Sequence, residues 1–222
     1  MQRTFLEEAA ATAIIEAARL ATGARPLWKG CAPEPRQRIY FANHTSHGDF
    51  VLLWSALPRY IRRTTRPIAG EDYWYKSKAR RWIVDRVFRA VTIPRVGGGR
   101  EAVERMRVAL EEGSSLIVFP EGTRNMTDQK LLPLRNGLFW LAHMRPDVEC
   151  VPVWIANLNR VLPKGEFLPI PLLCSVTFGT PMTLQPEETR EVFIARARDA
   201  LLSLAPRHLG SGAGVVATEG TP

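Results

Sequence analysis

The stretch FANHTSHGDF, residues 41–50, joins two apolar runs and sets the pattern from which the fold is predicted. The run that leads into it, Arg38 to Ala42, is short and has the composition of a β-strand. The run that follows, from about Asp49 to Leu57, has the character of a helix. Gly48 allows the chain to turn between the two. The stretch therefore predicts a strand, a turn and a helix in succession.

The same alternation continues along the chain. Further strands are expected at Pro67–Ala69, Val91–Pro94, Ser115–Phe119, Cys150–Ala156 and Leu173–Phe178. Further helices are expected at Tyr73–Phe88, Arg100–Glu112, Gly137–Met144 and about Pro186–Leu204. Strands that alternate with helices are typical of α/β domains. The sequence predicts a single α/β domain with a mainly parallel or mixed central sheet flanked by helices.

The first helix is expected to run from Thr4 to about Ala21. Thr4 and Glu7 fit a capping box, and Gly23 followed by Pro26 supplies a stop. One apolar stripe is expected on this helix, formed by Leu6, Ala10, Ala13, Ala17 and Leu20. Its polar face is acidic, so we expect the helix to pack on the domain rather than on an anionic membrane. The predicted division is an amphipathic helix in 1–25, the main domain in 26–206 and a disordered tail in 207–222.

Basic residues are concentrated in one part of the chain. The formal net charge is +8, and the segment from Arg59 to Arg89 holds ten Lys or Arg against three acidic residues, a local balance of +7. Aromatic residues are interleaved with them: Tyr60, Tyr73, Trp74, Tyr75 and Trp82. This mixture suits an anionic partner, whether lipid headgroups, a phosphorylated ligand or nucleic acid. A solvated basic helix face is the alternative.

The chain shows no sign of a spanning or secreted segment. No run approaches the roughly 20 apolar residues that cross a bilayer, and the start MQRTFLEEAA lacks the order of a secretory signal. Three scattered cysteines predict neither disulfides nor a thiolate metal site. We expect a cytoplasmic protein that associates peripherally with the inner face of the membrane.

His44 and Asp49 are the first candidates for chemistry. Five residues apart on a helix they would not share a face, so they can meet only if the chain turns between them. A carboxylate bonded to one imidazole nitrogen leaves the other free to take a proton, which makes a general base. Two alternatives remain: a metal site that adds His47, or a capping turn with Ser46 or Asp49 at the helix N-cap.

Two further segments place arginine directly after an expected strand. LIVFPEGTRN, residues 116–125, carries Arg124, a fork suited to phosphate, with Gly122 allowing close approach of the backbone. VTIPRVGGG, residues 91–99, carries Arg95 ahead of three glycines and a helix start. In open α/β sheets, ligands bind at the carboxyl ends of the strands. Each segment alone would equally suit an ordinary loop.

Taken in order, these segments resemble the glycerolipid acyltransferases, the family of the 1-acylglycerol-3-phosphate O-acyltransferases. NHTSHGD matches the family's N-H-x-x-x-x-D block, and FPEGTR matches its third block. TIPR and VPVWI stand where the second and fourth blocks belong, and the resemblance covers roughly Ile39 to Asn157. The chain departs from the family in the glycines after Arg95, and in Arg135 with Asn136, where a lysine often follows the third block.

The resemblance implies roles for these residues. His44 would take the proton of an acceptor hydroxyl, which attacks the thioester of acyl-CoA or acyl-carrier protein, and Asp49 would orient His44. The phosphate of a lysophosphatidate-type acceptor would lie against Arg95, Glu121, Gly122, Thr123 and Arg124. No metal or cofactor would be needed beyond the acyl donor as co-substrate. The absence of a G-x-S-x-G elbow also favours direct transfer over an acyl-serine intermediate.

The expected partners are an anionic membrane surface, a lysolipid acceptor and the acyl donor, without nucleic acid. Three other functions stay open from the sequence. The acceptor can be another lysolipid, such as a lyso-ornithine lipid or a lysophospholipid. The chain can also be a basic membrane or nucleic-acid binding module without catalysis, or a zinc hydrolase.

Overall fold

Strand β2 (Arg38–Ala42) lies at the centre of the sheet, and all five of its side chains are buried. The computed structural model describes residues 4–46, 48–94, 98–156 and 174–206. Alternate side chains of β2 point to opposite faces: Tyr40 enters one hydrophobic cluster, whereas Ile39 and Phe41 enter the other. A strand that is apolar on both faces needs a cover on both, and helices provide it.

The strands form one seven-stranded sheet in the order β1-β7-β6-β2-β5-β3-β4. The remaining strands are β1 (Arg25–Trp28), β3 (Thr65–Gly70), β4 (Val91–Ile93), β5 (Ser115–Val118), β6 (Glu149–Ala156) and β7 (Ser175–Phe178). All neighbours are parallel except β6 and β7, which are antiparallel. The predicted α/β fold with a mixed central sheet is confirmed.

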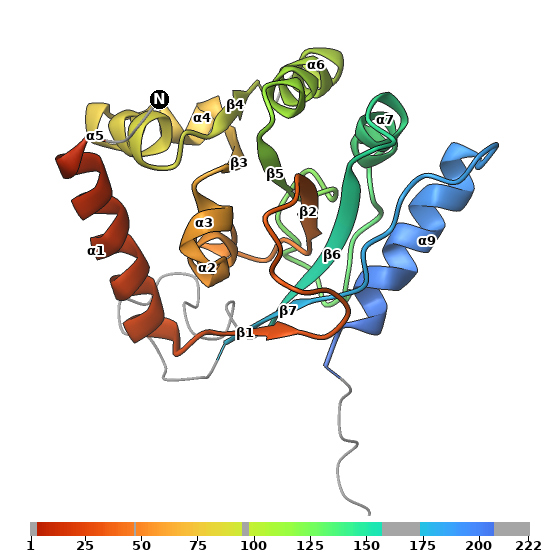
Figure 1. Ribbon diagram of the computed structural model, residues 1–222, viewed down its shortest axis with the longest axis horizontal. Helices are drawn as coiled ribbons and strands as arrows, with labels where there is room; N and C mark the ends of the chain where they lie inside the picture. The colour runs from red at the N-terminus through yellow and green to blue at the C-terminus, as the bar shows by residue number, and fades with distance from the viewer. Residues whose placement is uncertain (1–3, 47, 95–97, 157–173, 207–222) are drawn as a thin grey trace, which may run out of the picture.

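The helices divide between the two faces of this sheet (Figure 1). One face carries α1 (Phe5–Thr22), α2 (Asp49–Ala56), α3 (Arg59–Arg62), α4 (Glu71–Trp74), α5 (Lys78–Trp82) and the π-helix η1 (Ile83–Val87). The other face carries α6 (Gly99–Glu111), α7 (Gly137–Met144) and α9 (Arg190–Ser203). The carboxyl ends of the central parallel strands therefore open between two helical layers.

The prediction of one continuous helix over Tyr73–Phe88 is wrong. Ser77 has extended backbone angles, φ −145° and ψ 153°, and its hydroxyl accepts a hydrogen bond from the N–H of Arg80. Serine thus ends one turn and caps the next helix, a use for which its short polar side chain is suited. The segment is divided into α4, α5 and η1, and Arg89 follows in the left-handed region with φ 52°.

The prediction of which α1 residues face the core is also wrong, although the capping box of Thr4 and Glu7 is confirmed. The buried positions are Glu7, Ala11, Ile15 and Thr22, whereas Leu6 and Leu20 are exposed. Alanine contributes little apolar surface, so the larger Ile15 sets which side faces the core. Glu7 is tolerated there because its carboxylate pairs with Arg86 at 2.8 Å. The expected packing of this helix on the domain is confirmed.

Two boundaries differ from the sequence pattern. Strand β1 was not expected, because Pro26 was interpreted only as a helix stop; as an edge strand, β1 tolerates proline. The last helix begins at Arg190 rather than near Pro186, because the hydroxyl of Thr189 accepts from the N–H of Val192 and caps it. The predicted tail, 207–222, lies outside the described residues.

Candidate active site

The turn after β2 brings His44 and Asp49 together. Nδ1 of His44 lies 2.8 Å from Oδ2 of Asp49, and the His44 side chain keeps 14% of its surface exposed. The chain bends between β2 and α2 so that the two side chains meet, as the spacing required. Because Nδ1 faces a carboxylate, it is the nitrogen that carries the proton, and Nε2 is left as the acceptor.

Asp49 is fully buried, and the turn is built around its carboxylate. Oδ2 also accepts hydrogen bonds from the backbone N–H groups of Thr45 (2.6 Å) and Ser46 (2.8 Å). Oδ1 has no hydrogen-bond partner within the described part of the chain. The N-cap of α2 is Gly48, so the alternative that placed Ser46 or Asp49 at the N-cap is wrong. The Asp49 carboxylate instead fixes the loop and the imidazole together.

The main chain of His44 is held by the FPEGTR loop. Its N–H donates to Oε1 of Glu121 at 2.7 Å, and its C=O accepts from the N–H of Asn125 at 2.6 Å. The other oxygen of Glu121 accepts from the N–H of Leu132 at 2.9 Å. Glu121 is buried, and this burial raises the pKa of its carboxyl group. Both oxygens of this carboxylate are thus engaged with backbone around the base.

Asn43 fixes the loop from the other side. Its side-chain amide donates to the C=O of Ile155 at 3.0 Å and accepts from the N–H of Ile155 at 2.8 Å. The two bonds join β2 and β6 just beyond their last backbone pair, Ala42 and Val153. The residue before His44 is therefore held to β6, which fixes where the loop carrying His44 begins.

The FPEGTR loop presents its later residues outward. Gly122 has φ +69°, and a Cβ there would collide with the side chain of Arg135. Thr123 is exposed, and Arg124 is half-buried with no ion pair to any residue in the described ranges. Arg95, the other arginine expected to contact phosphate, lies outside the described residues, as does His47.

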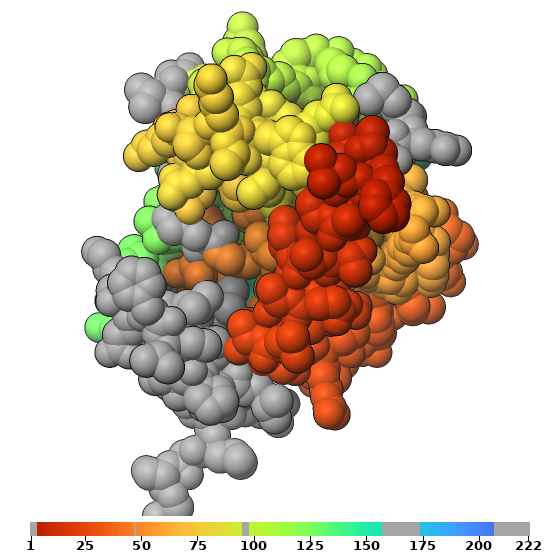
Figure 2. All heavy atoms as spheres, turned by 90° about the vertical axis from the view of Figure 1, so that its left-hand side faces the viewer, coloured from red at the N-terminus to blue at the C-terminus, as the bar shows by residue number. Residues whose placement is uncertain are grey.

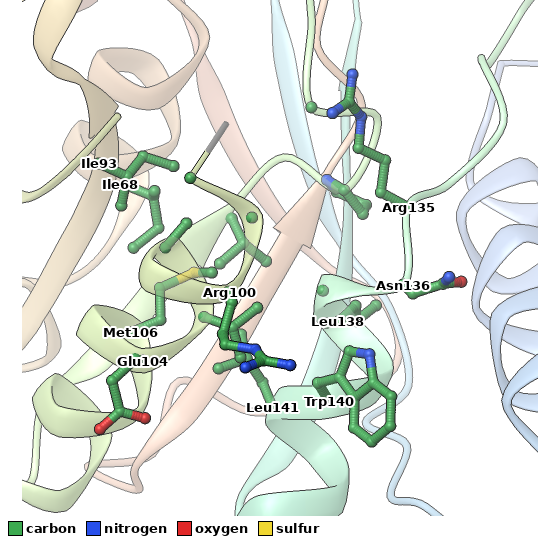
Figure 3. Close-up of a pocket in the computed structure, with 18 of the residues that line it drawn as sticks. Ile68, Ile93, Arg100, Glu104, Met106, Arg135, Asn136, Leu138, Trp140 and Leu141 are labelled. Carbon is green, nitrogen blue, oxygen red and sulfur yellow. The ribbon is translucent and has the colours of Figure 1, made fainter. Parts of the chain in front are cut away.

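A large cavity opens beside the base, between the carboxyl ends of β4 and β5 and the helices α6 and α7 (Figure 3). Its volume is about 960 Å³. The wall is mostly apolar and includes Ile68, Ile93, Met106, Val118, Leu138 and Leu141. Phe119 belongs to the same wall and stacks on the His44 ring, with 4.3 Å between the ring centroids. Gly122 and Arg135 line it as well, so this cavity adjoins the FPEGTR loop and is connected to the base through Phe119.

The sequence pointed to His44, Asp49 and the FPEGTR segment but not to the residues that assemble them. Asn43 and Phe119 received no role, and Glu121 was expected to line the phosphate site. Each acts through partners 77 to 112 positions away along the chain, or through a ring contact. Only the strand-end position of Asn43 and Phe119 hinted at proximity to the site.

Two features of the described residues bear on other functions. No cluster of three or more His, Cys, Asp or Glu side chains suited to a metal ion occurs among them. None of the helices in these residues combines the length and apolar character needed to cross a bilayer.

The chain is similar to several known proteins. The family model described as "Acyltransferase" matches residues 31–156. A 1-acyl-sn-glycerol-3-phosphate acyltransferase of Limnanthes douglasii is 30% identical over 160 residues, 69% of this chain and 53% of that protein. A protein of the same name from Saccharomyces cerevisiae is 30% identical over 131 residues, 56% of this chain and 40% of its own length.

The chain thus spans about half the length of the relatives it matches. The crystal structure of the 1-acyl-sn-glycerophosphate (LPA) acyltransferase PlsC from Thermotoga maritima superposes with a TM-score of 0.66 and 24% identity. The match covers 89% of this chain and 79% of that one, and it supports the fold.

Proposed function

The chain belongs to the acyltransferase family, and we propose that it is an O-acyltransferase acting on a lysophosphatidate-type acceptor. The donor is a fatty acyl thioester of CoA or of acyl-carrier protein. The observation that carries the proposal is the His44 and Asp49 pair, with the His44 ring stacked on Phe119, which lines a large apolar cavity. The relatives named for this activity support the acceptor class.

The chemistry assigned to the pair is direct transfer. Nε2 of His44 removes the proton of the acceptor hydroxyl, whose oxygen forms a bond to the thioester carbonyl carbon. The tetrahedral intermediate collapses with cleavage of the carbon–sulfur bond, and the imidazolium returns the proton to the departing thiolate. The products are an ester and a free thiol. Asp49 contributes by holding Nδ1–H and by balancing the positive charge that His44 gains during the reaction.

The cavity suits an acyl chain. Its apolar wall would remove methylene groups from water, which is worth about 0.8 kcal/mol per buried CH₂. Because Phe119 lies in this wall and also stacks on His44, a chain in the cavity would bring its carbonyl end toward the base. Chain-length preference would then follow from the depth of the cavity.

The acceptor phosphate is assigned to the FPEGTR loop. Gly122 and Thr123 leave backbone and hydroxyl exposed there, and the half-buried guanidinium of Arg124 has no ion pair among the described residues. Such a group binds phosphate through charge-assisted hydrogen bonds. Arg135, against Gly122, would add positive charge on the side facing the cavity. Arg95 is proposed to assist.

We assign membrane contact to the face formed by α4, α5 and the first turn of α1, which lie side by side (Figure 2). Lys76, Lys78, Arg80 and Arg81 are all exposed there, as are Tyr75 and Trp82. Phe5 is 90% exposed on the same face, where Glu7 bonds Arg86. Trp74, also expected to touch lipid, is half-buried and packs edge-on against Phe50 and Phe88 of the core. Basic residues held near an anionic leaflet contribute about 1 kcal/mol each.

The test of the proposed function is thiol release by the purified protein from acyl-CoA, with and without lysophosphatidate. His44→Ala should lower turnover about a hundredfold to ten-thousandfold while the circular dichroism spectrum stays unchanged. His47→Ala is the matched control and should have far less effect. A panel of other lysolipids in the same assay identifies the acceptor. Activity that survived in His44→Ala, or that depended equally on His47 and on bound zinc, would refute the base assignment.

A further inference from the structure

A second hollow, of about 460 Å³, lies at the opposite edge of the sheet from His44. His44 follows the carboxyl end of β2, whereas Thr65, Ala90 and Ser114, which line the hollow, stand at the amino ends of β3, β4 and β5. Because these four strands are parallel, the two sites face opposite ends of the sheet. The hollow therefore has no part in the acyl-transfer site.

Arginine dominates the charged lining of this hollow. Four arginines face three carboxylates: Arg63, Arg66, Arg86 and Arg89 against Glu7, Asp85 and Glu112. Each of these carboxylates is within ion-pair distance of an arginine other than Arg89: Glu7 of Arg86, Asp85 of Arg81 and Glu112 of Arg66. The backbone of Thr4 and the Arg86 side chain lower the pKa of Glu7 more than Arg89 does, and the Glu7 carboxylate bonds Arg86. The hollow thus keeps an excess of positive charge.

Arg89 has two further properties that set it apart. Its Nη2 atom is buried and has no hydrogen-bond partner within the described residues. A buried donor without a partner is costly and therefore calls for an explanation. Its backbone φ is +52°, a region that glycine or asparagine adopts more readily than arginine. The chain thus places an arginine where its backbone would favour glycine.

The neighbours of Arg89 hold it in this place. Nε of Arg66 donates to the C=O of Arg89 at 2.7 Å, and Nη1 of Arg66 pairs with Glu112 at 3.0 Å. Arg63 is more than half exposed at the rim, 3.7 Å from Glu8. One arginine held inside and one exposed arginine at the rim form an arrangement that suits an oxyanion entering from solvent.

We propose that this hollow is a second anion-binding site, specific for a phosphate group and separate from the acyl-transfer site. Arg89 is its principal ligand and Arg63 contributes from the rim. The phosphate can come from an anionic lipid headgroup or from a soluble phosphate compound. Asp85, in the hollow, pairs with Arg81 of α5, so the site adjoins the face assigned above to the membrane.

Arg89→Gly separates a ligand role from a structural one. Removing the side chain relieves the backbone strain, so without phosphate the variant should melt a few degrees higher than the wild type. Phosphate binding should weaken about tenfold or more, as expected for one lost charge-assisted contact. Arg25→Gln, an exposed arginine on β1 at the other edge of the sheet, is the control for the loss of one charge. If Arg89→Gly fails to fold, Arg63→Gln replaces it, with a smaller loss of binding.

Two measurements distinguish the sources of phosphate. The first is the melting temperature against inorganic phosphate at constant ionic strength; the second is sedimentation with phosphatidylcholine vesicles with and without phosphatidate. An Arg89-dependent rise in melting temperature supports the site for soluble phosphate, and an Arg89-dependent loss of phosphatidate binding alone supports a lipid headgroup. The proposal is overturned if Arg89→Gly matches the wild type in both, or if Arg25→Gln loses as much. Thiol release from soluble substrates should be unchanged in Arg89→Gly, so failure here leaves the acyltransferase proposal intact.

Discussion

Replacing Asp49 by asparagine should cost less activity than removing the base, because the loop dictates how the amide sits. Oδ2 of Asp49 accepts from Thr45 N–H, Ser46 N–H and the His44 ring. An amide NH₂ at that position would face two backbone donors, so the asparagine oxygen should occupy it. The imidazole would then keep its proton on Nδ1 and remain oriented. Only the negative charge opposite the imidazolium would be lost.

The expected loss follows from the hydrogen-bond energies. A hydrogen bond to a charged group is worth about 1.5–3 kcal/mol and a neutral one about 0.5–1.5, a difference of roughly 1–2 kcal/mol. Turnover of Asp49→Asn should therefore fall roughly 5- to 30-fold. Asp49→Ala leaves two backbone donors without an acceptor, at about 1–3 kcal/mol each where water is excluded. That variant should lose both activity and stability.

The assay is the initial rate of thiol release with saturating acyl-CoA and lysophosphatidate, with the melting temperature of each variant measured in parallel. His44→Ala sets the floor. The reasoning would be refuted if Asp49→Asn were as inactive as His44→Ala while melting like the wild type. That result would mean that the two backbone donors do not hold the amide oxygen in place.

Other predictions test the remaining parts of the site and fold. Arg124→Ala should raise KM for the phosphorylated acceptor about tenfold or more and leave KM for the donor nearly unchanged, with Arg95→Ala weaker; equal losses for both substrates would indicate a structural role. Changing the exposed bases Lys76, Lys78, Arg80 and Arg81 together to glutamine should reduce sedimentation with anionic vesicles and spare turnover of a short-chain soluble acceptor, whereas unchanged sedimentation would contradict the assigned face. Burial raises the pKa of Tyr40 from 10.0 to about 12, so stability present below pH 10 should be lost as pH rises from 10 to 12, by roughly 2–3 kcal/mol. Tyr40→Phe should flatten that decline in the free energy of unfolding measured by urea, and an equal slope in both proteins would disprove the cause.

The sequence predicted the strand-turn-helix unit at the base because its signal is local. A short apolar run, a glycine and a second apolar run together specify the turn, and the turn brings His44 to Asp49. The break within Tyr73–Phe88 was missed because its signal is a single hydroxyl, at Ser77, that competes with helix continuation. The buried side of α1 was missed because it depends on a partner far along the chain, Arg86.

The candidate site likewise combines residues that local sequence signals identify with residues that act through contacts distant in sequence. The residues that would carry the chemistry could be named from motif order, since each follows a strand whose carboxyl end meets the others. The residues that align them could not be named, because their partners are distant in sequence. Asn43 bonds Ile155 across the sheet, and the roles of Glu121 and Phe119 depend on where His44 comes to rest.

The backbone of His44 lies between two bonds to one loop, its N–H on Glu121 and its C=O on the N–H of Asn125. Segments that share such bonds open together, as one cooperative unit of local unfolding. The segment that would deprotonate the acceptor and the segment that would grip its phosphate are therefore not two independent loops. Any fluctuation large enough to release the phosphate-binding segment also disengages the base. A half-assembled site is therefore scarcely populated. Such a site would be able to activate a hydroxyl without an acceptor held in place.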